Sequence, residues 1–322
     1  MSRYILKRIL WLIPVMLIIS LLSFALMYLS PGDPAMIYLS MGGDAPTEEA
    51  YLAMREKLGL DDPFWTRYAN WIKGIITKGD FGTSIYTGNP VTYEIKQYFP
   101  NTLKLTLYAM LLTLVLSIPL GILSATHEGG FADVLIRGIS FIASSLPGFF
   151  ASLLLIYFLG VKLRWLPVIS SGEKNGFVIP MLVLAITISP SYIRQIRALM
   201  IDELNSEHVR LFRSRGIKER LIVYRNALKS AVPTIFTLTG LNVGHLLGGS
   251  AIIEMVCTYH GLGRLAVNSI SNRDYPLIQG FVLVMATVYV LVNLIVDIAN
   301  AYADPRVRYR LLSEGGKKAE DA

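Results

Sequence analysis

The sequence predicts an all-α integral membrane protein with six transmembrane helices. Of its 322 residues, 53% are hydrophobic and only 16% are charged, whereas soluble domains usually carry about 25% charged residues. Six long apolar stretches and an uneven distribution of basic residues between the connecting segments support the same class. The net charge of +7 follows that distribution, so it fits basic cytoplasmic loops better than a nucleic-acid-binding surface, and no nucleic-acid partner is expected.

Each apolar stretch comes close to the length of about 20 residues that a helix needs to cross the hydrocarbon core. The stretches lie at residues 9–29, 105–125, 138–161, 177–193, 230–253 and 275–296. The fourth is short and is expected to extend into residues 194–200. The first runs directly into the sequence SPGDP without a small-residue cleavage pattern, so we expect a retained helix rather than a signal peptide.

The distribution of basic residues indicates that both termini lie inside the cell. With the N-terminus inside, the cytoplasmic segments carry 18 Lys and Arg residues and the outer segments carry 11. More than half of the outer ones lie in one long loop at residues 30–100, which also carries nine acidic residues. Long loops obey the positive-inside rule weakly, so an N-in/C-in arrangement is favoured.

The long outer loop contains signals for two helices. Thr47 is placed to cap a helix that Gly59 ends. Asp62 is placed to cap a second helix, with Pro63 in its first turn, and Gly79 ends that helix. Aromatic and aliphatic residues recur at helical spacing along the second helix. Two interpretations remain open: a cap that packs on the outer ends of the spans or in the membrane interface, and a docking surface for an external partner.

A second unusual segment is the basic loop at residues 194–229, with nine Lys and Arg residues against four acids. Ser206 can cap a short helix at residues 207–215, and Gly216 is expected to end it in a left-handed turn. A further helix is expected at residues 218–229. Such a helix–Gly–helix segment is either a charged surface bound to anionic lipid or a lever that fits a soluble partner.

Residues 207–216, with the sequence EHVRLFRSRG, resemble the EAA loop of ABC importer permeases. Other segments are similar, in the same order, to the dipeptide/oligopeptide/nickel branch: RYILKRI from position 3, SPGDP from position 30, GDFGTS from position 79, GLGR from position 261, NRDYP from position 272 and DPRVR from position 304. There are two departures. Leu211 and Phe212 replace two small residues, and Tyr259-His260 replaces a Trp-Pro pair.

The resemblance implies a multi-pass permease subunit with a type I ABC importer permease fold in the cytoplasmic (inner) membrane. It implies as partners a second homologous permease subunit, two ATP-binding ABC ATPase subunits and an extracytoplasmic solute-binding protein, with membrane lipid around the spans. The chain contains no GxxxxGK[ST] phosphate loop, so ATP hydrolysis falls to the partners. We therefore expect a transport subunit that is not an enzyme and that needs no cofactor.

The expected division of the chain follows these features. Residues 1–100 hold the first transmembrane helix and the external helical segment. Residues 101–302 hold the five-helix permease core, including a cytoplasmic coupling loop at residues 201–232, and residues 303–322 form a cytoplasmic tail.

The coupling loop supplies the first set of candidate site residues. They are Glu207, Arg210, Arg213, Arg215 and Gly216. The resemblance implies that the short helix moves as a rigid body with the ATPase subunits, and the arginines are candidates for charge-assisted contacts to them. Arg210 and Arg213 share one helix face, and Arg215 lies off it. For any single arginine, the alternative is plain positive-inside charge.

The spans supply the pore candidates. They are Pro147, Asn242, His245 and Ser250. Pro147 in the third span and Pro190 in the fourth predict kinks, which are either hinges or fixed shape. The other three candidates lie in the fifth span among glycines that allow close helix packing, with His245 on one face and Asn242 close to it. His245 is either part of the pathway or a hydrogen-bonded residue between helices, and Glu254 is expected to be structural.

The cargo is less sharply defined. The branch imports dipeptides, oligopeptides or nickel. The loop at residues 162–176 is short, as in nickel-type members, and His245, His260, Cys257 and Met255 offer nitrogen and sulfur ligands. The sequence interpretation therefore leans slightly toward nickel, as a metal chelate, with a di- or oligopeptide as the alternative.

Two other classes of protein fit the sequence less well. An intramembrane enzyme would need a His/Asp/Glu cluster at catalytic spacing inside the spans, and the sequence shows none. An ATP-independent secondary transporter often shows inverted repeats with broken helices in both halves, which this sequence also lacks. The secondary transporter remains the alternative from another class.

Overall fold

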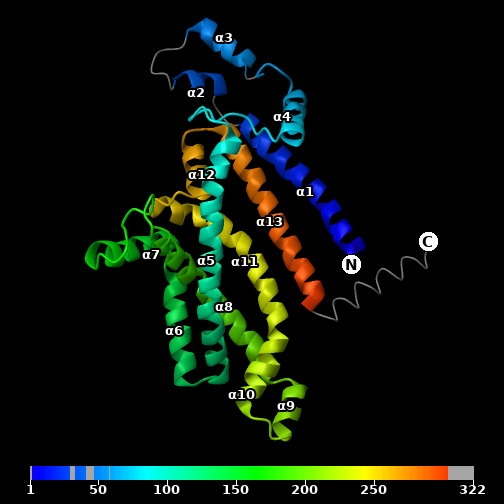
Figure 1. The fold of residues 1–322 in the computed structure, drawn as a ribbon, viewed down its shortest axis with the longest axis vertical. Helices are drawn as coiled ribbons and strands as arrows, with labels where there is room; N and C mark the ends of the chain where they lie inside the picture. Colours follow the sequence, from blue (N-terminus) through cyan, green and yellow to red (C-terminus); the bar gives the residue numbers. More distant parts are fainter. Residues whose placement is uncertain (1, 30–32, 41–46, 58, 304–322) are drawn as a thin grey trace, which may run out of the picture. The chain divides into compact units, whose positions relative to one another are not determined.

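The computed structural model describes residues 2–29, 33–40, 47–57 and 59–303 (Figure 1). The expected tail, apart from its first residue, lies outside these residues. Apart from the connecting turns and loops, the described chain is helical, with one isolated β-bridge between Thr83 and Pro90. It divides into two compact units, residues 1–102 with 260–290 and residues 103–259 with 291–322.

The first unit contains the external segment. Its helices are α1 (Ser2–Leu29), α2 (Pro34–Ser40), α3 (Glu48–Lys57), α4 (Phe64–Lys78), α12 (Leu262–Ser271), the start of α5 (Val91–Thr126) and most of α13 (Tyr275–Ala303). Aromatic rings attach α4 to α1: the ring of Phe24 lies 5.4 Å from that of Phe64, 5.5 Å from that of Tyr68 and 5.6 Å from that of Trp71. The external segment is therefore folded against the first span.

The helix signals of the external segment are nearly all in place. Gly59 and Gly79 adopt φ values of 60° and 63°, as expected of residues that end helices. The Thr47 hydroxyl accepts a hydrogen bond from the Ala50 amide at 3.3 Å. One detail was wrong: Pro63, rather than Asp62, occupies the N-cap of α4. Pro63 has extended backbone angles, so α4 begins at residue 64, and no side chain caps its first turn.

A buried carboxylate joins the loop before α5 to the start of α13. Asp274, which is 1% exposed, accepts hydrogen bonds from the Ser84 hydroxyl at 2.5 Å and from the amides of Ile85 and Tyr86 at 3.2 and 3.3 Å. It also accepts a bond from the Leu277 amide in the first turn of α13. One side chain thus caps a helix and anchors a loop about 190 residues earlier in the sequence.

The second unit holds the candidate functional residues. Its elements are the rest of α5, α6 (Phe131–Ser145), α7 (Gly148–Leu155), the π-helical η1 (Ile156–Lys162), α8 (Val178–Leu204), α9 (Glu207–Ser214), α10 (Glu219–Leu221), the π-helical η2 (Ile222–Ala227), α11 (Leu228–Val256) and the end of α13. Helix α8 packs on both α6 and α11. Tyr192, Ile196 and Met200 are fully buried at these contacts, and Gly121 of α5 leaves room for Ile196.

Length and composition account for all six expected spans. Among the described residues, four helices qualify by themselves: Leu12–Leu29, Val91–Thr126, Val178–Leu204 and Tyr275–Val296. Two bent pairs supply the others: Phe131–Ser145 with Gly148–Lys162, and Glu219–Gly244 with Leu246–Val256. The first pair bends by 100° and the second by 49°. The 100° bend falls at Pro147, where the sequence predicts a kink, and α7 leaves α6 at a sharp angle there (Figure 1).

Candidate coupling site and translocation pathway

Helix α9 and the turn after it form where the sequence places them. Ser206 stands at the N-cap with extended backbone angles. Gly216 follows the helix with φ of 72°, a left-handed conformation that strains any residue with a Cβ atom. Its amide donates to the Arg213 carbonyl at 3.0 Å, and the Ile217 amide donates to the Phe212 carbonyl at 3.2 Å. These bonds reverse the chain directly after α9.

Arg213 braces this loop from within. Its guanidinium donates to Glu219 through Nη2 at 2.6 Å and through Nε at 3.2 Å, and to the Leu204 carbonyl through Nη1 at 3.2 Å. The hydrogen bond to Glu219 favours the charged form and raises the pKa of Arg213 above its usual value. Arg213 therefore ties the end of α8 to α9 and α10, a contact that sequence spacing alone did not indicate.

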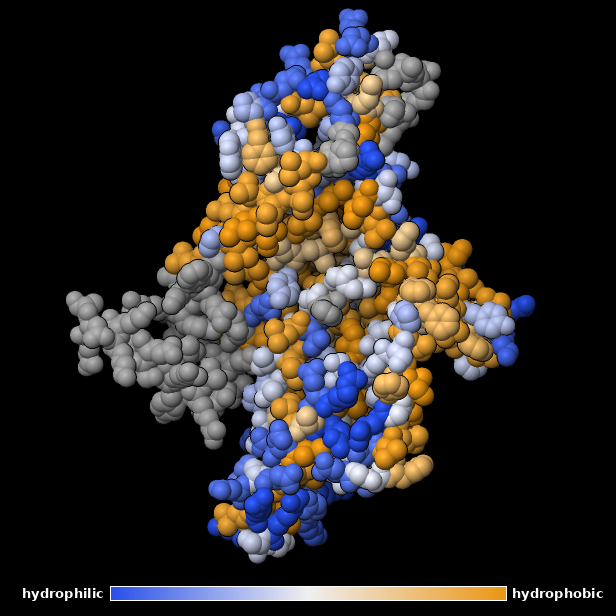
Figure 2. Space-filling view, turned by 180° about the vertical axis from the view of Figure 1, so that it is seen from behind, coloured by the Kyte–Doolittle hydropathy of each residue, from blue (hydrophilic) through white to orange (hydrophobic). Residues whose placement is uncertain are grey.

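The two faces of α9 differ in what they contact. Val209 is fully buried, and Phe212 packs on the hydrophobic core beneath the helix. On the other face, Arg210 is exposed and Leu211 is 50% exposed. Figure 2 shows polar side chains gathered at the lower end of the view, where α9 and α10 lie in Figure 1. The coupling helix thus presents a basic residue and one large apolar side chain outward.

The remaining coupling candidates also lie on the surface. Glu207 is exposed in the first turn of α9. Arg215 is exposed at the C-cap, beyond the face that carries Arg210. The structure therefore leaves Glu207, Arg210 and Arg215 open to a partner, whereas Arg213 is engaged within the loop.

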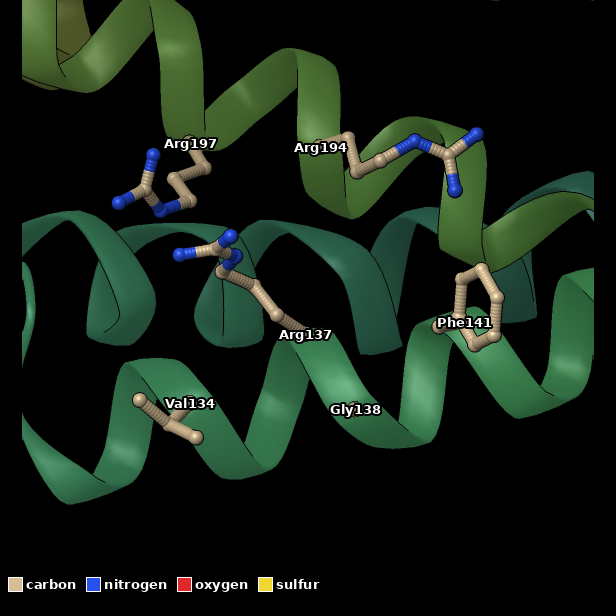
Figure 3. Close-up of a pocket in the computed structure, with 6 residues that line it drawn as sticks. All are labelled: Val134, Arg137, Gly138, Phe141, Arg194 and Arg197. Carbon is tan, nitrogen blue, oxygen red and sulfur yellow. The ribbon is translucent and has the colours of Figure 1, made fainter.

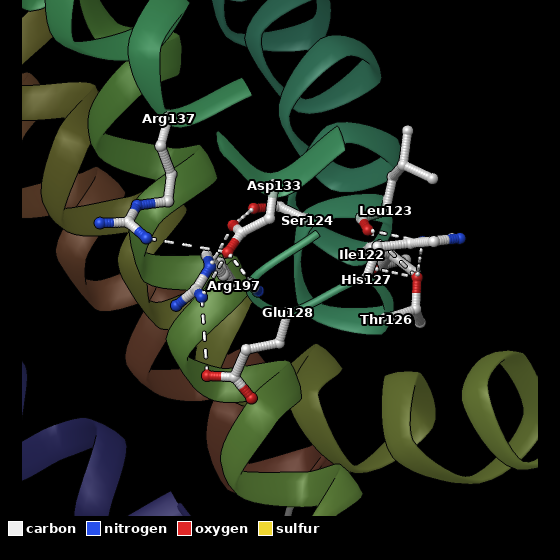
Figure 4. A network of polar contacts seen from close by, with 10 residues as sticks. Ile122, Leu123, Ser124, Thr126, His127, Glu128, Asp133, Arg137 and Arg197 are labelled. Carbon is white, nitrogen blue, oxygen red and sulfur yellow. Dashed lines mark hydrogen bonds and ion pairs between the residues drawn. The ribbon is translucent and has the colours of Figure 1, made fainter. Parts of the chain in front are cut away.

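Helix α8, which leads into α9, is fixed to α6 by a charge pair that the sequence interpretation missed. The two helices flank a groove to which each contributes arginines (Figure 3). Beside it, the buried carboxylate of Asp133 accepts hydrogen bonds from Arg197 through Nε at 2.7 Å and Nη2 at 2.9 Å (Figure 4). It also accepts bonds from the Ser124 hydroxyl at 2.5 Å and the Gly129 amide at 3.0 Å. The turn between α5 and α6 is thus attached to α8.

The pore candidates of α11 bond mainly within their own helix. The Asn242 side chain donates to the Leu238 carbonyl at 2.8 Å. Ser250 is buried and donates to the Leu247 carbonyl and to the Glu254 carboxylate, both at 3.1 Å. The Ser250–Glu254 pair lies on the fully buried side of the helix rather than on an open face.

The remaining pore candidates are His245 and Pro147. The backbone of His245 lies in α11, but its side chain lies outside the described part of the structure. Pro147 is exposed at the bend between α6 and α7, at the N-cap of α7. The sequence interpretation missed Tyr192 of α8, whose hydroxyl reaches the Leu238 carbonyl of α11 at 3.3 Å. That contact links α8, the helix that leads into α9, to α11, which carries three of the pore candidates.

The residues named as nickel ligands gain no geometric support. Within the described residues, no group of three His, Cys, Asp or Glu side chains is arranged to hold a metal ion. Cys257 is buried. His260 stacks on the ring of Tyr98 with the centroids 4.6 Å apart.

Comparison with known proteins places the chain in a family. The model described as "Binding-protein-dependent transport system inner membrane component" matches residues 117–309. The model described as "Binding-prot-dependent transport system membrane comp, N-term" matches residues 1–106. Together the two models match all the described helices except residues 107–116 of α5.

Named relatives and a solved structure agree with this result. The glutathione transport system permease protein GsiC of Escherichia coli (strain K12) is 35% identical over 310 residues, covering 96% of this chain and 100% of the relative. The probable peptide ABC transporter permease protein y4tP of Sinorhizobium fredii is 35% identical over 317 residues, with the same two coverages. A chain of the MetNI methionine ABC transporter, in an inward-facing conformation, has a TM-score of 0.56 at 18% identity, covering 66% of this chain and 98% of that chain, which shows a shared fold.

These findings agree with the all-helical fold and the six spans expected from the sequence. The chain belongs to the binding-protein-dependent transport system inner membrane components: it is a multi-pass permease subunit of an ABC importer in the cytoplasmic membrane, a transport component rather than an enzyme, in a family that works with ATPase and binding-protein partners.

Proposed function

We propose that this permease imports a small peptide into the cytoplasm. The observation that carries the proposal is the 35% identity, over 96% of the chain, to permeases named for glutathione and for peptides. This favours the peptide alternative over the slight lean to nickel. The nickel interpretation rests on a short loop and on residues that form no metal-ligand group in the described structure.

The assembly we propose contains four kinds of subunit. This chain pairs with a second homologous permease, two ABC ATPase subunits bind on the cytoplasmic side, and an extracytoplasmic binding protein delivers the peptide. The external segment, whose helix α4 packs on α1 through Phe24, offers the binding protein a folded surface. On the cytoplasmic side, α9 is the element offered to the ATPase.

The coupling step proposed here uses α9 as a rigid handle. Glu207, Arg210, Arg215 and the exposed Leu211 contact the ATPase, while Val209 and Phe212 hold the helix on the permease core. Arg213 and the turn at Gly216 keep α9 fixed to the end of α8, so a displacement of α9 is transmitted to α8. A population shift between two states needs contacts that differ between them, and the exposed face of α9 supplies groups for such contacts.

The translocation pathway we propose runs beside α11 and the bend between α6 and α7. Asn242, His245 and Ser250 are the α11 candidates, and Pro147 stands at the bend between α6 and α7. Tyr192 connects α8 to α11, so a movement of α8 is transmitted to α11, the helix proposed to line the pathway. Ser250 contributes in this proposal through its bond to Glu254, as a support for the helix rather than as a ligand of the peptide.

Reconstituted transport tests the proposal directly. The complex, purified with its partner subunits and placed in liposomes with the binding protein, is expected to take up labelled glutathione or a di- or tripeptide only when ATP is present on the cytoplasmic side. Nickel uptake with no peptide uptake would overturn the peptide assignment. Peptide uptake by the permease alone, without ATPase subunits, would identify an ATP-independent carrier instead.

A further inference from the structure

A groove of about 710 Å³ lies between α6 and α8, away from the coupling face of α9. It is lined by Val134, Arg137, Gly138, Phe141, Arg194 and Arg197. Figure 3 shows the guanidinium groups of Arg137 and Arg197 turned toward one another, with Arg194 extending toward the end of the groove that holds Phe141. The lining combines three cations with an apolar floor from α6.

The charges in the groove are not balanced. Arg197 is bonded to Asp133 and lies 3.6 Å from Glu128. Asp133 already accepts four hydrogen bonds, the capacity of one carboxylate, and the nearest atom of Arg137 stays 3.7 Å away from it (Figure 4). Arg194 bonds to the neutral Ser144 hydroxyl at 3.1 Å. Three cations thus face two carboxylates, and Arg137 and Arg194 keep donors for an anion.

The surroundings of the groove are apolar and exposed. On α6, Phe141 is 73% exposed, Ile142 is 64% exposed and Ile139 is 59% exposed, and Phe131 at its start is 83% exposed. Large apolar side chains at such exposure are typical of a helix in contact with acyl chains. A ligand of the groove therefore meets cations and hydrocarbon together, as an anionic amphiphile requires.

The depth of the arginines matches the headgroup layer. Helix α6 begins, and α8 ends, on the cytoplasmic side of the N-in/C-in arrangement. Arg137 lies six residues after the first residue of α6, and Arg197 and Arg194 lie seven and ten residues before the last residue of α8. At about 1.5 Å of rise per residue, Arg137 and Arg197 lie about 10 Å along their helices from those ends, and Arg194 lies about 15 Å. Long Arg side chains at such a depth reach the interface.

We propose that this groove binds the headgroup phosphate of an anionic phospholipid of the cytoplasmic leaflet. Arg137 and Arg194 donate hydrogen bonds to the phosphate, and the acyl chains follow the apolar face of α6. Arg197 acts as a positioning residue, because Asp133 holds it in place. The site goes beyond peptide import and does not depend on the identity of the cargo. Because α8 leads into α9, lipid in this groove stabilises the helix that precedes the coupling loop.

Lipid binding to the intact transporter complex provides the test. Native mass spectrometry would follow the titration of the detergent-solubilised complex with phosphatidylglycerol and, separately, with phosphatidylcholine. Arg137→Gln with Arg194→Gln is expected to weaken phosphatidylglycerol binding at the tightest site about 30-fold, which corresponds to about 1 kcal/mol for each arginine. The matched control is Arg220→Gln with Arg225→Gln, two exposed cytoplasmic arginines outside the groove, which is expected to leave that site unchanged.

Competition separates the possible anions. Millimolar inorganic phosphate and the transported peptide are both expected to leave phosphatidylglycerol bound. Displacement by phosphate alone would identify a simple anion site, and displacement by the peptide would assign the groove to the cargo pathway; either result overturns the proposal. Equal binding of phosphatidylglycerol by the groove variant and the control variant would also overturn it.

A measurement on the unmodified protein guards against misfolding of the variant. Phosphatidylglycerol with a photoreactive group in its headgroup is expected to label residues 134–141 and 194–197 in the wild-type complex. Labelling confined to other segments would overturn the proposal, whatever the variants do. Peptide uptake in liposomes is measured independently, so failure of the lipid site and failure of the peptide assignment give different results.

Discussion

Breaking the brace between Arg213 and Glu219 should uncouple α9 from the permease without unfolding it. Both side chains are about half exposed, at 43% and 56%, so their ion pair contributes about 0.5 kcal/mol. The bond from Arg213 to the Leu204 carbonyl adds about 1 kcal/mol. A total loss of about 1.5 kcal/mol lowers the ratio of braced to unbraced loops about tenfold.

The assay compares transport with ATP hydrolysis in the same liposomes. Arg213→Gln is expected to lower peptide uptake several-fold while ATP hydrolysis continues, so that more ATP is consumed for each peptide transported. Glu219→Gln is expected to have a smaller effect in the same direction, because Arg213 keeps its bond to the Leu204 carbonyl. Thermal unfolding of the complex should change little, since about 1.5 kcal/mol is lost locally in an exposed loop.

The charge-reversed double variant, Arg213→Glu with Glu219→Arg, separates the brace from a direct contact with the ATPase. If the pair acts within the loop, the reversal restores part of the coupling that either single reversal loses. The reasoning is refuted if Arg213→Gln leaves the ratio of ATP to peptide unchanged. It is refuted equally if the double reversal is as uncoupled as Arg213→Glu alone, since that result assigns Arg213 to the partner interface.

Three further predictions concern buried charge, backbone strain and pH. Asp133→Ala is expected to destabilise the protein by about 3–5 kcal/mol, seen as a large drop in its unfolding temperature, because Arg197 loses its buried partner. Gly216→Ala is expected to lower the local stability of the turn by about 1–2 kcal/mol through its positive φ alone, since nothing lies within 4 Å of the added Cβ. Hydrogen exchange of α9 should therefore become faster. Gly129→Ala is the matched comparison, because Gly129 has the same φ and lies outside the coupling loop. Burial alone would raise the pKa of Asp33, but the Tyr51 hydrogen bond and other contacts lower it below 3.8. The resulting stabilisation of the external segment is complete above about pH 3.8 and is lost as the pH falls through the lowered pKa. Hydrogen exchange of α3 should therefore become faster at low pH. In an Asp33→Asn variant, the exchange of α3 should not show this pH dependence.

Local features were predictable from the sequence. The six spans follow from apolar length, and the turns at Gly59, Gly79 and Gly216 follow from residues that tolerate a left-handed conformation. The kink at Pro147 follows from the missing backbone donor and the clash of the ring. These signals depend on a few neighbouring residues, so one sequence is enough to recognise them.

Contacts between distant segments were not predictable in the same way. Nothing near Asp133 in the sequence indicates that Arg197, 64 residues later, supplies its counter-charge. Arg213 was expected to face a partner, and the structure shows it bonded to Glu219 across the turn. The buried role of Ser250 depends on which side of α11 meets its neighbours, which helical periodicity leaves undecided when apolar residues surround the helix.

The 100° bend at Pro147 has a consequence for hydration. A helix end leaves about four backbone amides or carbonyls without a partner in their own helix, and hydrocarbon offers none. Two helix ends meet at this bend, and the bonds from the Leu146 amide to the Ala143 carbonyl and from the Ala151 amide to the Pro147 carbonyl satisfy some of these groups. The lipid tails therefore cannot surround this point on all sides. Water or a neighbouring subunit has to contact the bend, so the hydrocarbon layer around this span is interrupted there.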